Sequence, residues 1–454
     1  FARTPGSYSV KDIRFKLLIK GRRNAKGSFD CRPVVPCFMS GFWMGSDNSF
    51  GVEGLPADAP EKLRLRLGLD PDAPLRISYI PGPGDLAGTY ECWRRREHDP
   101  RSPIITYSAQ FFELVKRLGI DAQIFVQTSV PRDQMDRSLS FHRIARGSWN
   151  SRKEYFAAQN DYGNRVCSAI DAFAPHLILA ATDFPSAFWP RLARRSQRLL
   201  LTAHNTFWPM GQRLGGAKGV YRKAQIAWRA RSIDDAICTS AECARQIAQV
   251  TLGRVQGLAQ IPQIAHRHAV KRVSRVRNLL YLGRIEHDKG VFMLLDAFAS
   301  LKSDFPDLTL VFAGAGSATA ELEALIAKLD DPRVSLVGKL DGAAVHRAID
   351  AADLLVCPTR TAFNEGLAVV GFEAAAHGVP SLMSSIVPAI DALGEGCAVF
   401  EADSQDAMEA ELRDLIVNEG RVAAMSDQLA VVREALYDRD RSWGSQLARV
   451  VLRI

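Results

Sequence analysis

The chain lacks a run of apolar residues long enough to predict a membrane-spanning helix, and it lacks a cysteine or histidine spacing typical of zinc sites. A membrane helix needs about 18–20 apolar residues in succession. The most apolar stretch, 166–184, is interrupted by two aspartates, a proline and a histidine. The eight cysteines are scattered and form no Cys-x-x-Cys pair. We therefore predict no membrane span, no metal site, and a reducing, cytoplasmic setting.

The sequence also lacks a concentrated basic stripe, which excludes the usual pattern of a nucleic-acid-binding protein. The net charge is +8 over 454 residues, and residues 1–60 hold nine basic and five acidic side chains, so half of that charge lies in the first 60 residues. The rest is only mildly basic. Anionic small molecules or a phospholipid surface suit this balance better than DNA or RNA.

The length predicts two domains. Residues 1–72 mix Gly, Pro, Ser and basic residues without a period, and we expect a poorly ordered leader, either disordered or not part of the native protein. The alternative is a basic arm that contacts a membrane or a partner. Strands alternating with helices predict parallel sheets in an N-terminal domain, 73–260, and a C-terminal domain, 261–454, whose last helix packs back on the first domain. The predicted strands are 76–81, 123–126, 176–181, 198–203, 235–239, 278–283, 308–313, 334–337, 353–357, 380–383 and 397–400.

Two glutamates near the end of one predicted strand are placed to bind a ligand. The strand ending at Cys357 leads through a polar loop, 359–366, into a predicted helix over 367–377. Glu365 precedes the helix N-terminus, and Glu373 lies in its second turn. Backbone N–H groups at a helix N-terminus attract phosphate. A carboxylate one or two turns further along can accept hydrogen bonds from two neighbouring hydroxyls.

Three motifs occur in order within 278–384. They are Gly283-Arg284-Ile285-Glu286-His287-Asp288-Lys289-Gly290, then Phe312-Ala313-Gly314-Ala315-Gly316, and then Phe363-Asn364-Glu365-Gly366 followed by Glu373-Ala374-Ala375-Ala376-His377-Gly378-Val379-Pro380. Together they resemble the donor domain of retaining family 4 glycosyltransferases. The resemblance covers about 75–450. It implies the α/β GT-B architecture, in which two doubly wound Rossmann-like domains face an interdomain cleft.

The resemblance also implies roles for these residues. Arg284 and Lys289 would bind the donor diphosphate, which would let the nucleoside diphosphate leave without a metal ion. Glu373 would bind the ribose. Glu365 would contact the donor sugar and stabilise positive charge at its anomeric carbon. The remaining donor-binding residues, by the same resemblance, are Asn364, Gly366 and Leu367 through their amides, Gly314, and the 338–340 segment beside the base.

In the first domain, the family pattern places a histidine and a glycine in the cleft. His204 follows the strand 198–203 and is predicted to lie near the transferred sugar as a second catalytic residue. Gly84 follows the first strand and would let the backbone approach the donor phosphate and the acceptor. For Asp183, a role in orienting the acceptor hydroxyl is the weaker of two readings, the other being an ordinary strand-end residue.

The stretch 213–231 combines basic side chains with Val220, Tyr221 and Trp228. A basic amphipathic helix suits contact with an anionic membrane, and a solvated helix face is the alternative. Two segments depart from the family pattern: the linker reads Ile261-Pro262-Gln263-Ile264, and the loop after strand 380–383 reads Ser384-Ser385-Ile386-Val387-Pro388. The second departure leaves the sugar preference and the activity open.

We expect a retaining, metal-independent glycosyltransferase that moves a sugar from a nucleotide-diphosphate sugar to a sugar or lipid-linked acceptor, with no cofactor. Cell-envelope or polysaccharide synthesis in the cytoplasm, peripherally on the inner face of the membrane, is the expected setting. A nucleotide-sugar epimerase or phosphorylase of similar fold and an inactive nucleotide-sugar-binding paralogue are the alternatives.

Overall fold

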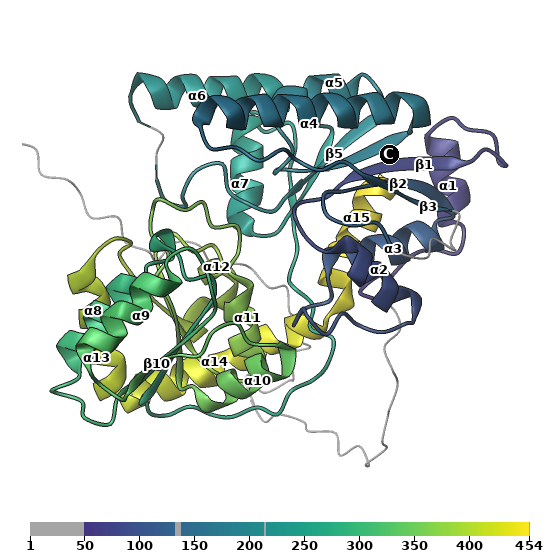
Figure 1. Cartoon of the computed structure of the whole chain (residues 1–454). Coiled ribbons are helices and arrows are strands. Elements are labelled where there is room, and N and C mark those ends of the chain that lie inside the picture. Colours follow the sequence, from purple (N-terminus) through teal and green to yellow (C-terminus); the bar gives the residue numbers. More distant parts are fainter. Residues whose placement is uncertain (1–49, 132–137, 213–214, 454) are drawn as a thin grey trace, which may run out of the picture. The chain divides into compact units, whose positions relative to one another are not determined.

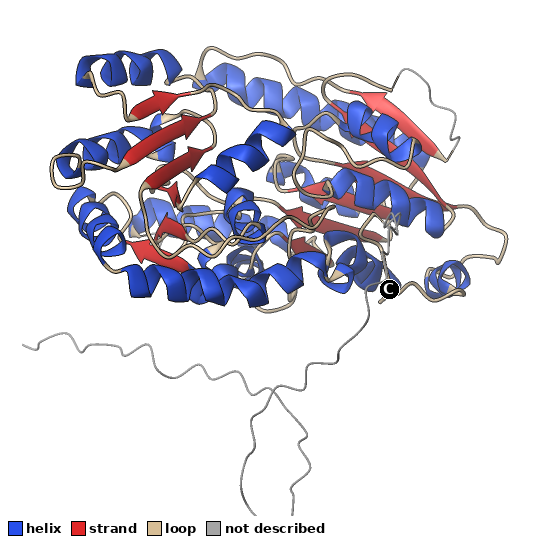
Figure 2. Ribbon diagram, turned by 90° about the horizontal axis from the view of Figure 1, so that it is seen from below, coloured by secondary structure: helices blue, strands red, loops and turns tan. Residues whose placement is uncertain are grey.

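The computed structural model describes residues 50–131, 138–212 and 215–453. They form two parallel β-sheets, each covered by helices (Figure 1), which confirms the predicted α/β class and the two Rossmann-like domains. All strand pairs of both sheets are parallel, and the buried strands are rich in Leu, Ile, Val and Ala, as strands covered on both faces require. Figure 2 shows the strands in red among the blue helices.

The N-terminal sheet has the strand order β3-β2-β1-β4-β5-β6-β7. Its strands are β1 (Leu75–Ile80), β2 (Ile120–Val126), β3 (Leu139–Arg143), β4 (Leu177–Ala181), β5 (Arg198–Ala203), β6 (Asp235–Cys238) and β7 (Leu258–Ala259). The helices of this half are α1 (Ala59–Arg66), α2 (Leu86–Arg94), α3 (Tyr107–Arg117), α4 (Arg152–Phe173), α5 (Trp189–Ala193), α6 (Gly216–Ala230) and α7 (Ala241–Val250). The edge strands β3 and β7 are absent from the sequence prediction. Strand β7 has only two residues, and polar Ser140, His142 and Arg143 interrupt the apolar pattern of β3.

The C-terminal sheet has the order β10-β9-β8-β11-β12-β13. Its strands are β8 (Asn278–Leu282), β9 (Thr309–Ala313), β10 (Val334–Leu336), β11 (Leu354–Cys357), β12 (Ser381–Ser384) and β13 (Cys397–Phe400). The remaining helices are α8 (Val291–Leu301), α9 (Thr319–Leu329), α10 (Gly342–Ala351), α11 (Val369–Ala376), α12 (Ile390–Leu393), α13 (Gln405–Val417), α14 (Glu419–Tyr437) and α15 (Trp443–Leu452). In both sheets the strand order reverses beside the first strand, and ligands of such sheets bind at the carboxyl ends of the strands there.

The predicted end of the leader at residue 72 is wrong. Phe50 and Val52 are almost completely buried, and α1 contributes Leu63 to the same apolar core as the first sheet. Helix α1 also packs against α15. Residues 50–72 therefore belong to the packed part of the chain; their few apolar side chains are too widely spaced to show a period. Residues 1–49 lie outside the described residues.

Helix α15 packs on the N-terminal sheet, against α3 and β6. Figure 1 shows this yellow helix beside the purple and blue elements of the first half. Trp443 is fully buried there, and its Nε1 donates a hydrogen bond to Thr202 Oγ1 at 3.3 Å.

The segment 260–277 connects β7 to β8 and is held by backbone hydrogen bonds. The N–H of Ile261 donates to the carbonyl of Arg441, and the N–H of Ile264 donates to that of Leu436. The carbonyl of Gln263 accepts from the N–H of Ile105 at 2.7 Å. This connection is therefore an ordered strap that contacts both halves of the chain.

Candidate active site

The loops that follow β8 and β9 touch each other at two glycines. Gly314 has φ +149°, and a Cβ on it would lie 1.7 Å from the carbonyl oxygen of Gly283. Only glycine allows this approach. The contact leaves the exposed Arg284 side chain beside the carboxyl end of the sheet.

Lys289 and Glu365 form an ion pair at this end of the sheet. The Lys289 Nζ lies 2.5 Å from Glu365 Oε2, and the two side chains are only 15% and 12% exposed. Thr359 Oγ1 also donates to that carboxylate oxygen at 3.5 Å. The ring of Phe363 lies 3.8 Å from Lys289 Nζ and 5.4 Å from Arg284 Cζ, so one aromatic face has a cation–π contact with both cations.

Cys357, the last residue of β11, lies within electrostatic range of three of the predicted site residues. Its thiol pKa is raised to about 12, mainly by burial and also by the charges of Glu365 and Glu373, while Lys289 lowers it. All three side chains therefore act on one buried sulfur atom. The structure brings Lys289, Glu365 and Glu373 to the same strand end.

Glu373 is 8% exposed, and burial raises its pKa to about 7. A buried carboxyl of this kind is half protonated near neutral pH. Hydrogen bonds donated by ligand hydroxyls would stabilise the ionised form of this carboxylate.

A cavity of about 900 Å³ contains Glu373, Arg284 and Gly314 in its wall. The wall also includes Lys339 and Leu340 from the loop after β10, which are two of the three residues of the predicted 338–340 segment. Residues of the first half close the other side: Pro100, Arg101 and Pro103. The volume suits a nucleotide-sized ligand, since ligand pockets span about 300–1,000 Å³.

A second cavity, of about 650 Å³, adjoins the first, because Arg101 and Lys339 line both. Its wall contains His204, Gly84 and Asp183, which are the three residues singled out in the N-terminal domain. The arrangement places two ligand-sized spaces side by side, one against each sheet.

His204 is held in a stack. Its ring lies 5.3 Å from that of Tyr107 with an interplanar angle of 28°, and its Nε2 lies 3.2 Å from Thr202 Oγ1. Burial lowers the pKa of His204, and the nearby Asp183 carboxylate opposes this only in part. The imidazole is therefore neutral at neutral pH and can exchange hydrogen bonds with a ligand.

The loops that carry His204 and Glu365 meet directly. A Cβ on Gly366 would lie 1.7 Å from the carbonyl oxygen of His204, and Thr206 Oγ1 donates to the carbonyl of Glu365 at 3.2 Å. The two predicted catalytic residues are thus joined through their backbones, across a contact that tolerates no side chain at position 366.

Several predicted donor-binding residues do not line either cavity. Lys289 and Glu365 contact each other beneath Phe363, Leu367 is buried in the apolar core, and Asn364 and Gly366 lie in the adjoining loop. The predicted helix start at Leu367 is wrong: Ala368 has φ +64°, so α11 begins at Val369. The left-handed residue moves the helix start two residues further along the chain from Glu365.

The departure at 384–388 lies in the core. Val387 is fully buried, and Ser384 Oγ donates to the carbonyl of Thr359 at 2.6 Å. None of its residues lines the two cavities. Three residues of the candidate site were not predicted from the sequence. Phe363 lies inside a motif quoted above, whereas Arg101 and Tyr107 lie in no motif.

Two Asp-x-Asp runs, a spacing found at metal sites, occur away from the cavities. Asp70-Pro71-Asp72 precedes β1, and Asp438-Arg439-Asp440 follows α14. Neither run contributes to the walls of the two cavities.

Helix α6 covers part of the stretch 213–231, for which an amphipathic helix was predicted. Val220, Tyr221 and Trp228 are each more than 60% exposed, whereas Ile226 and Ala230 are buried. Arg213 lies outside the described residues. No helix in the described part of the chain is both long and apolar enough to span a bilayer.

Comparison with known proteins agrees with this geometry. Residues 264–430 match the family model for glycosyl transferases group 1. A segment of 203 residues is 30% identical to the glycogen synthase of Mycobacterium tuberculosis strain CDC 1551 / Oshkosh, covering 41% of this chain and 46% of that protein. The chain thus spans about half the length of this curated relative.

Solved structures show the same fold at low sequence identity. Sucrose-phosphate synthase from Thermosynechococcus elongatus superposes with a TM-score of 0.59 at 16% identity, covering 83% of this chain and 98% of that one. HepE from Anabaena, in complex with UDP and glucose, gives a TM-score of 0.55 at 13% identity, covering 84% and 100%. The chain therefore has the GT-B fold, and its second half contains a glycosyl transferases group 1 domain.

Proposed function

We propose that this protein is a retaining, family 4 glycosyltransferase that moves a sugar from a nucleotide-diphosphate sugar to an acceptor hydroxyl. The observation that carries the proposal is the shared strand end, where Arg284 and Glu373 line one cavity and the Lys289–Glu365 pair lies beside it. A nucleotide sugar combines a diphosphate, a ribose and a sugar, and this site offers cations and carboxylates for all three. The HepE complex with UDP and glucose supports this donor class.

The donor diphosphate is held by Arg284 and Lys289. An Arg guanidinium offers paired N–H donors to phosphate oxygens, and a Lys ammonium offers three donors in a compact charge. Glu365 uses one of the three on Lys289. The other two N–H donors of Lys289 are available to a phosphate. Gly314 has no side chain, so a phosphate could approach the backbone there. Glu373 accepts hydrogen bonds from the ribose hydroxyls.

Transfer proceeds at the front face of the sugar. The bond from the anomeric carbon to the diphosphate oxygen breaks, the acceptor oxygen bonds to the same face of that carbon, and the acceptor proton passes to the leaving phosphate oxygen. Arg284 and Lys289 stabilise the charge on the leaving diphosphate, and Glu365 stabilises the positive charge on the sugar ring. No metal ion and no protein nucleophile is needed for these steps.

The second cavity binds the acceptor. His204 is neutral and stacked on Tyr107, so it offers a fixed hydrogen-bonding group near the transferred sugar. Asp183 and Gly84 line the same wall, where an acceptor hydroxyl would be oriented for attack. Holding the donor and the acceptor in adjoining cavities increases the rate of transfer through proximity.

The proposed biological acceptor is a sugar or a lipid-linked sugar of polysaccharide or cell-envelope synthesis. The proposed location is the cytoplasmic side of a membrane. The exposed apolar residues of α6, with Lys218, Arg222 and Lys223 on the same helix, support peripheral contact with anionic lipid.

The test has two stages. A thermal-shift panel of UDP, GDP, ADP and their sugars identifies the donor base, and one nucleotide series is expected to raise Tm. Release of that diphosphate is then measured with and without oligosaccharide acceptors. Release that depends on an acceptor supports transfer. Epimerised sugar, or binding with no release under any acceptor, contradicts it, and so does a panel in which no nucleotide raises Tm.

A further inference from the structure

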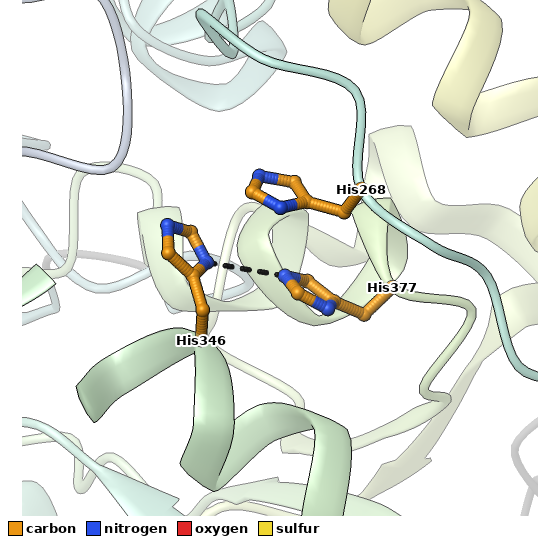
Figure 3. A group of neighbouring side chains, drawn as sticks. All are labelled: His268, His346 and His377. Atoms are coloured by element: carbon orange, nitrogen blue, oxygen red, sulfur yellow. Dashed lines mark hydrogen bonds between the residues drawn. The ribbon is translucent and has the colours of Figure 1, made fainter. Parts of the chain in front are cut away.

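Three of the nine histidines meet at one place outside both cavities. His268 lies in the connection 260–277, His346 lies on α10, and His377 follows the last residue of α11. One nitrogen of each ring lies within 4.8 Å of the nitrogens of the other two. Figure 3 shows the three side chains next to one another, with the hydrogen bond between His346 and His377 drawn as a dashed line.

We propose that His268, His346 and His377 form a binding site for a divalent transition-metal ion of the zinc class, with the Asp350 carboxylate orienting His377. Imidazole nitrogen suits Zn²⁺, and three histidines are a known protein ligand set for this ion, which leaves a fourth position for water. The site is separate from the proposed transfer chemistry and does not depend on it.

The separations between the rings suit metal ligation. His346 Nδ1 and His377 Nε2 lie 3.1 Å apart. In tetrahedral zinc with bonds of 2.0–2.1 Å, neighbouring ligand atoms lie about 3.3 Å apart. The ring of His268 stacks on that of His377, with 4.3 Å between the centroids and an interplanar angle of 21°, and lies 4.3 Å from that of His346. Because stacked rings do not aim their in-plane lone pairs at one point, metal binding would require the His268 side chain to turn out of this stack.

The tautomer of His377 is set by a carboxylate. His377 Nδ1 lies 2.6 Å from Asp350 Oδ1, so Nδ1 carries the proton and donates it, and Nε2 presents its lone pair to His346. A carboxylate behind a ligating histidine is the usual outer partner at zinc sites. His346 now donates its Nδ1 proton to this lone pair. Moving that proton to Nε2 would free both facing nitrogens for one ion.

The surroundings of the three histidines fix the position of His377. His377 is 2% exposed, and its carbonyl accepts a hydrogen bond from the Lys271 N–H at 3.1 Å. Metal ions bind the neutral form of imidazole, so binding would displace a proton from any of the three rings that carries a charge.

A bound ion would join three parts of the chain. It would tie the connection between the sheets to α10 and α11, and Val345, beside His346, lines the first cavity. Since the ion would bind the folded protein and a preformed cluster does not exist in the unfolded chain, it should raise the free energy of unfolding.

The experiment uses the full chain without a polyhistidine tag, stripped with a chelator and titrated with Zn²⁺ by calorimetry. We expect one ion per chain and a rise in Tm. His346→Gln and His268→Gln each should abolish tight binding, and Asp350→Asn should weaken it about 10–100-fold. His142 lies in β3 of the other sheet, so His142→Gln is the matched control and should bind Zn²⁺ as the parent protein does.

Circular dichroism of the stripped variants separates loss of the site from loss of the fold, because His268 and His346 are half-exposed and their replacement should leave the spectrum unchanged. Co²⁺ absorption in the parent protein should report nitrogen coordination that both variants lose. Binding that is equal in the parent and in His346→Gln, or no binding of Zn²⁺ by the folded parent, would overturn the proposal.

Discussion

The ammonium of Lys289 and the carboxylate of Glu365 form an almost buried ion pair 2.5 Å apart, although 76 residues separate them in the sequence. Lys289 comes from the loop after β8, and Glu365 comes from the loop after β11, the neighbouring strand. The pair therefore connects the predicted diphosphate loop to the predicted sugar-binding loop. In the proposed mechanism, this pair holds the Lys289 ammonium that stabilises the leaving diphosphate.

Replacing Lys289 by alanine should reduce transfer strongly. Removing one donor that stabilises transition-state charge lowers kcat by about 10²–10³-fold. The unfolding free energy should fall by only about 1–2 kcal/mol, because Glu365 keeps Thr359 as a donor. Diphosphate-release kinetics and chemical denaturation measure the two effects. Lys328→Ala, on the exposed side of α9, should change neither, and full turnover in Lys289→Ala would remove this residue from the site.

Glu373 should make stability and donor binding depend on pH in opposite directions. Its pKa rises from 4.5 to about 7 on folding, so between these values the unfolded chain releases a proton that the folded protein retains. The free energy of unfolding therefore falls as pH increases through this window and levels off above it. Donor affinity should increase over the same range, because the ionised carboxylate accepts stronger hydrogen bonds from ribose.

Glu373→Gln should abolish both trends. The variant should be more stable than the parent at pH 8.5 and equal to it near pH 4.5, and it should bind nucleotide with weak, pH-independent affinity. Glu323→Gln, an exposed glutamate on α9, serves as the control. Parallel melting curves for the parent and Glu373→Gln from pH 5 to 8.5 would show that the pKa of Glu373 is unperturbed.

Gly366→Ala should impair turnover more than folding. The added methyl group would overlap the carbonyl oxygen of His204, so the two loops must separate. We expect kcat/KM to fall by at least about tenfold, since misplacement by an ångström can have a large effect on rate. Gly84→Ala is the comparison in the same site, because its methyl group would meet only Leu86 Cδ1 at 3.8 Å. Equal kinetics for the two variants would argue against a functional contact at Gly366.

Helix α6 should bring the protein to anionic vesicles. The exposed Tyr221 and Trp228 can enter the lipid interface while basic side chains face the headgroups. Flotation with vesicles containing phosphatidylglycerol should recover the parent protein at low salt and lose it at high salt. The double variant Tyr221→Ser/Trp228→Ser should bind poorly, whereas Leu325→Ser, an equally simple loss of an exposed apolar side chain, should bind normally. Equal recovery of both variants would assign α6 to an ordinary solvated surface.

Much of this protein was determined by local sequence. Buried strands such as 354–357 and 198–203 are short apolar runs bounded by turn residues, and that pattern predicted eleven strands, the parallel sheets and the two halves. The resemblance carried by the motifs around Lys289 and Glu365 implied that these residues share one donor site, and the pairing of β8 with β11 brings the two together. Among the structural elements, the edge strands β3 and β7 and the packed segment 50–72 were not predicted, since a few buried side chains among polar ones leave no period.

Tertiary structure alone decided the rest. Arg101 reaches the first cavity from a loop with no motif, and Ala368 takes a left-handed conformation that delays α11 beyond the predicted start. His268, His346 and His377 are 31 to 109 residues apart in the sequence, so no spacing rule could group them. They meet because the connection between the sheets passes over α10 and α11, and a cluster of ligand atoms depends on position in space and on burial, which a linear pattern does not encode.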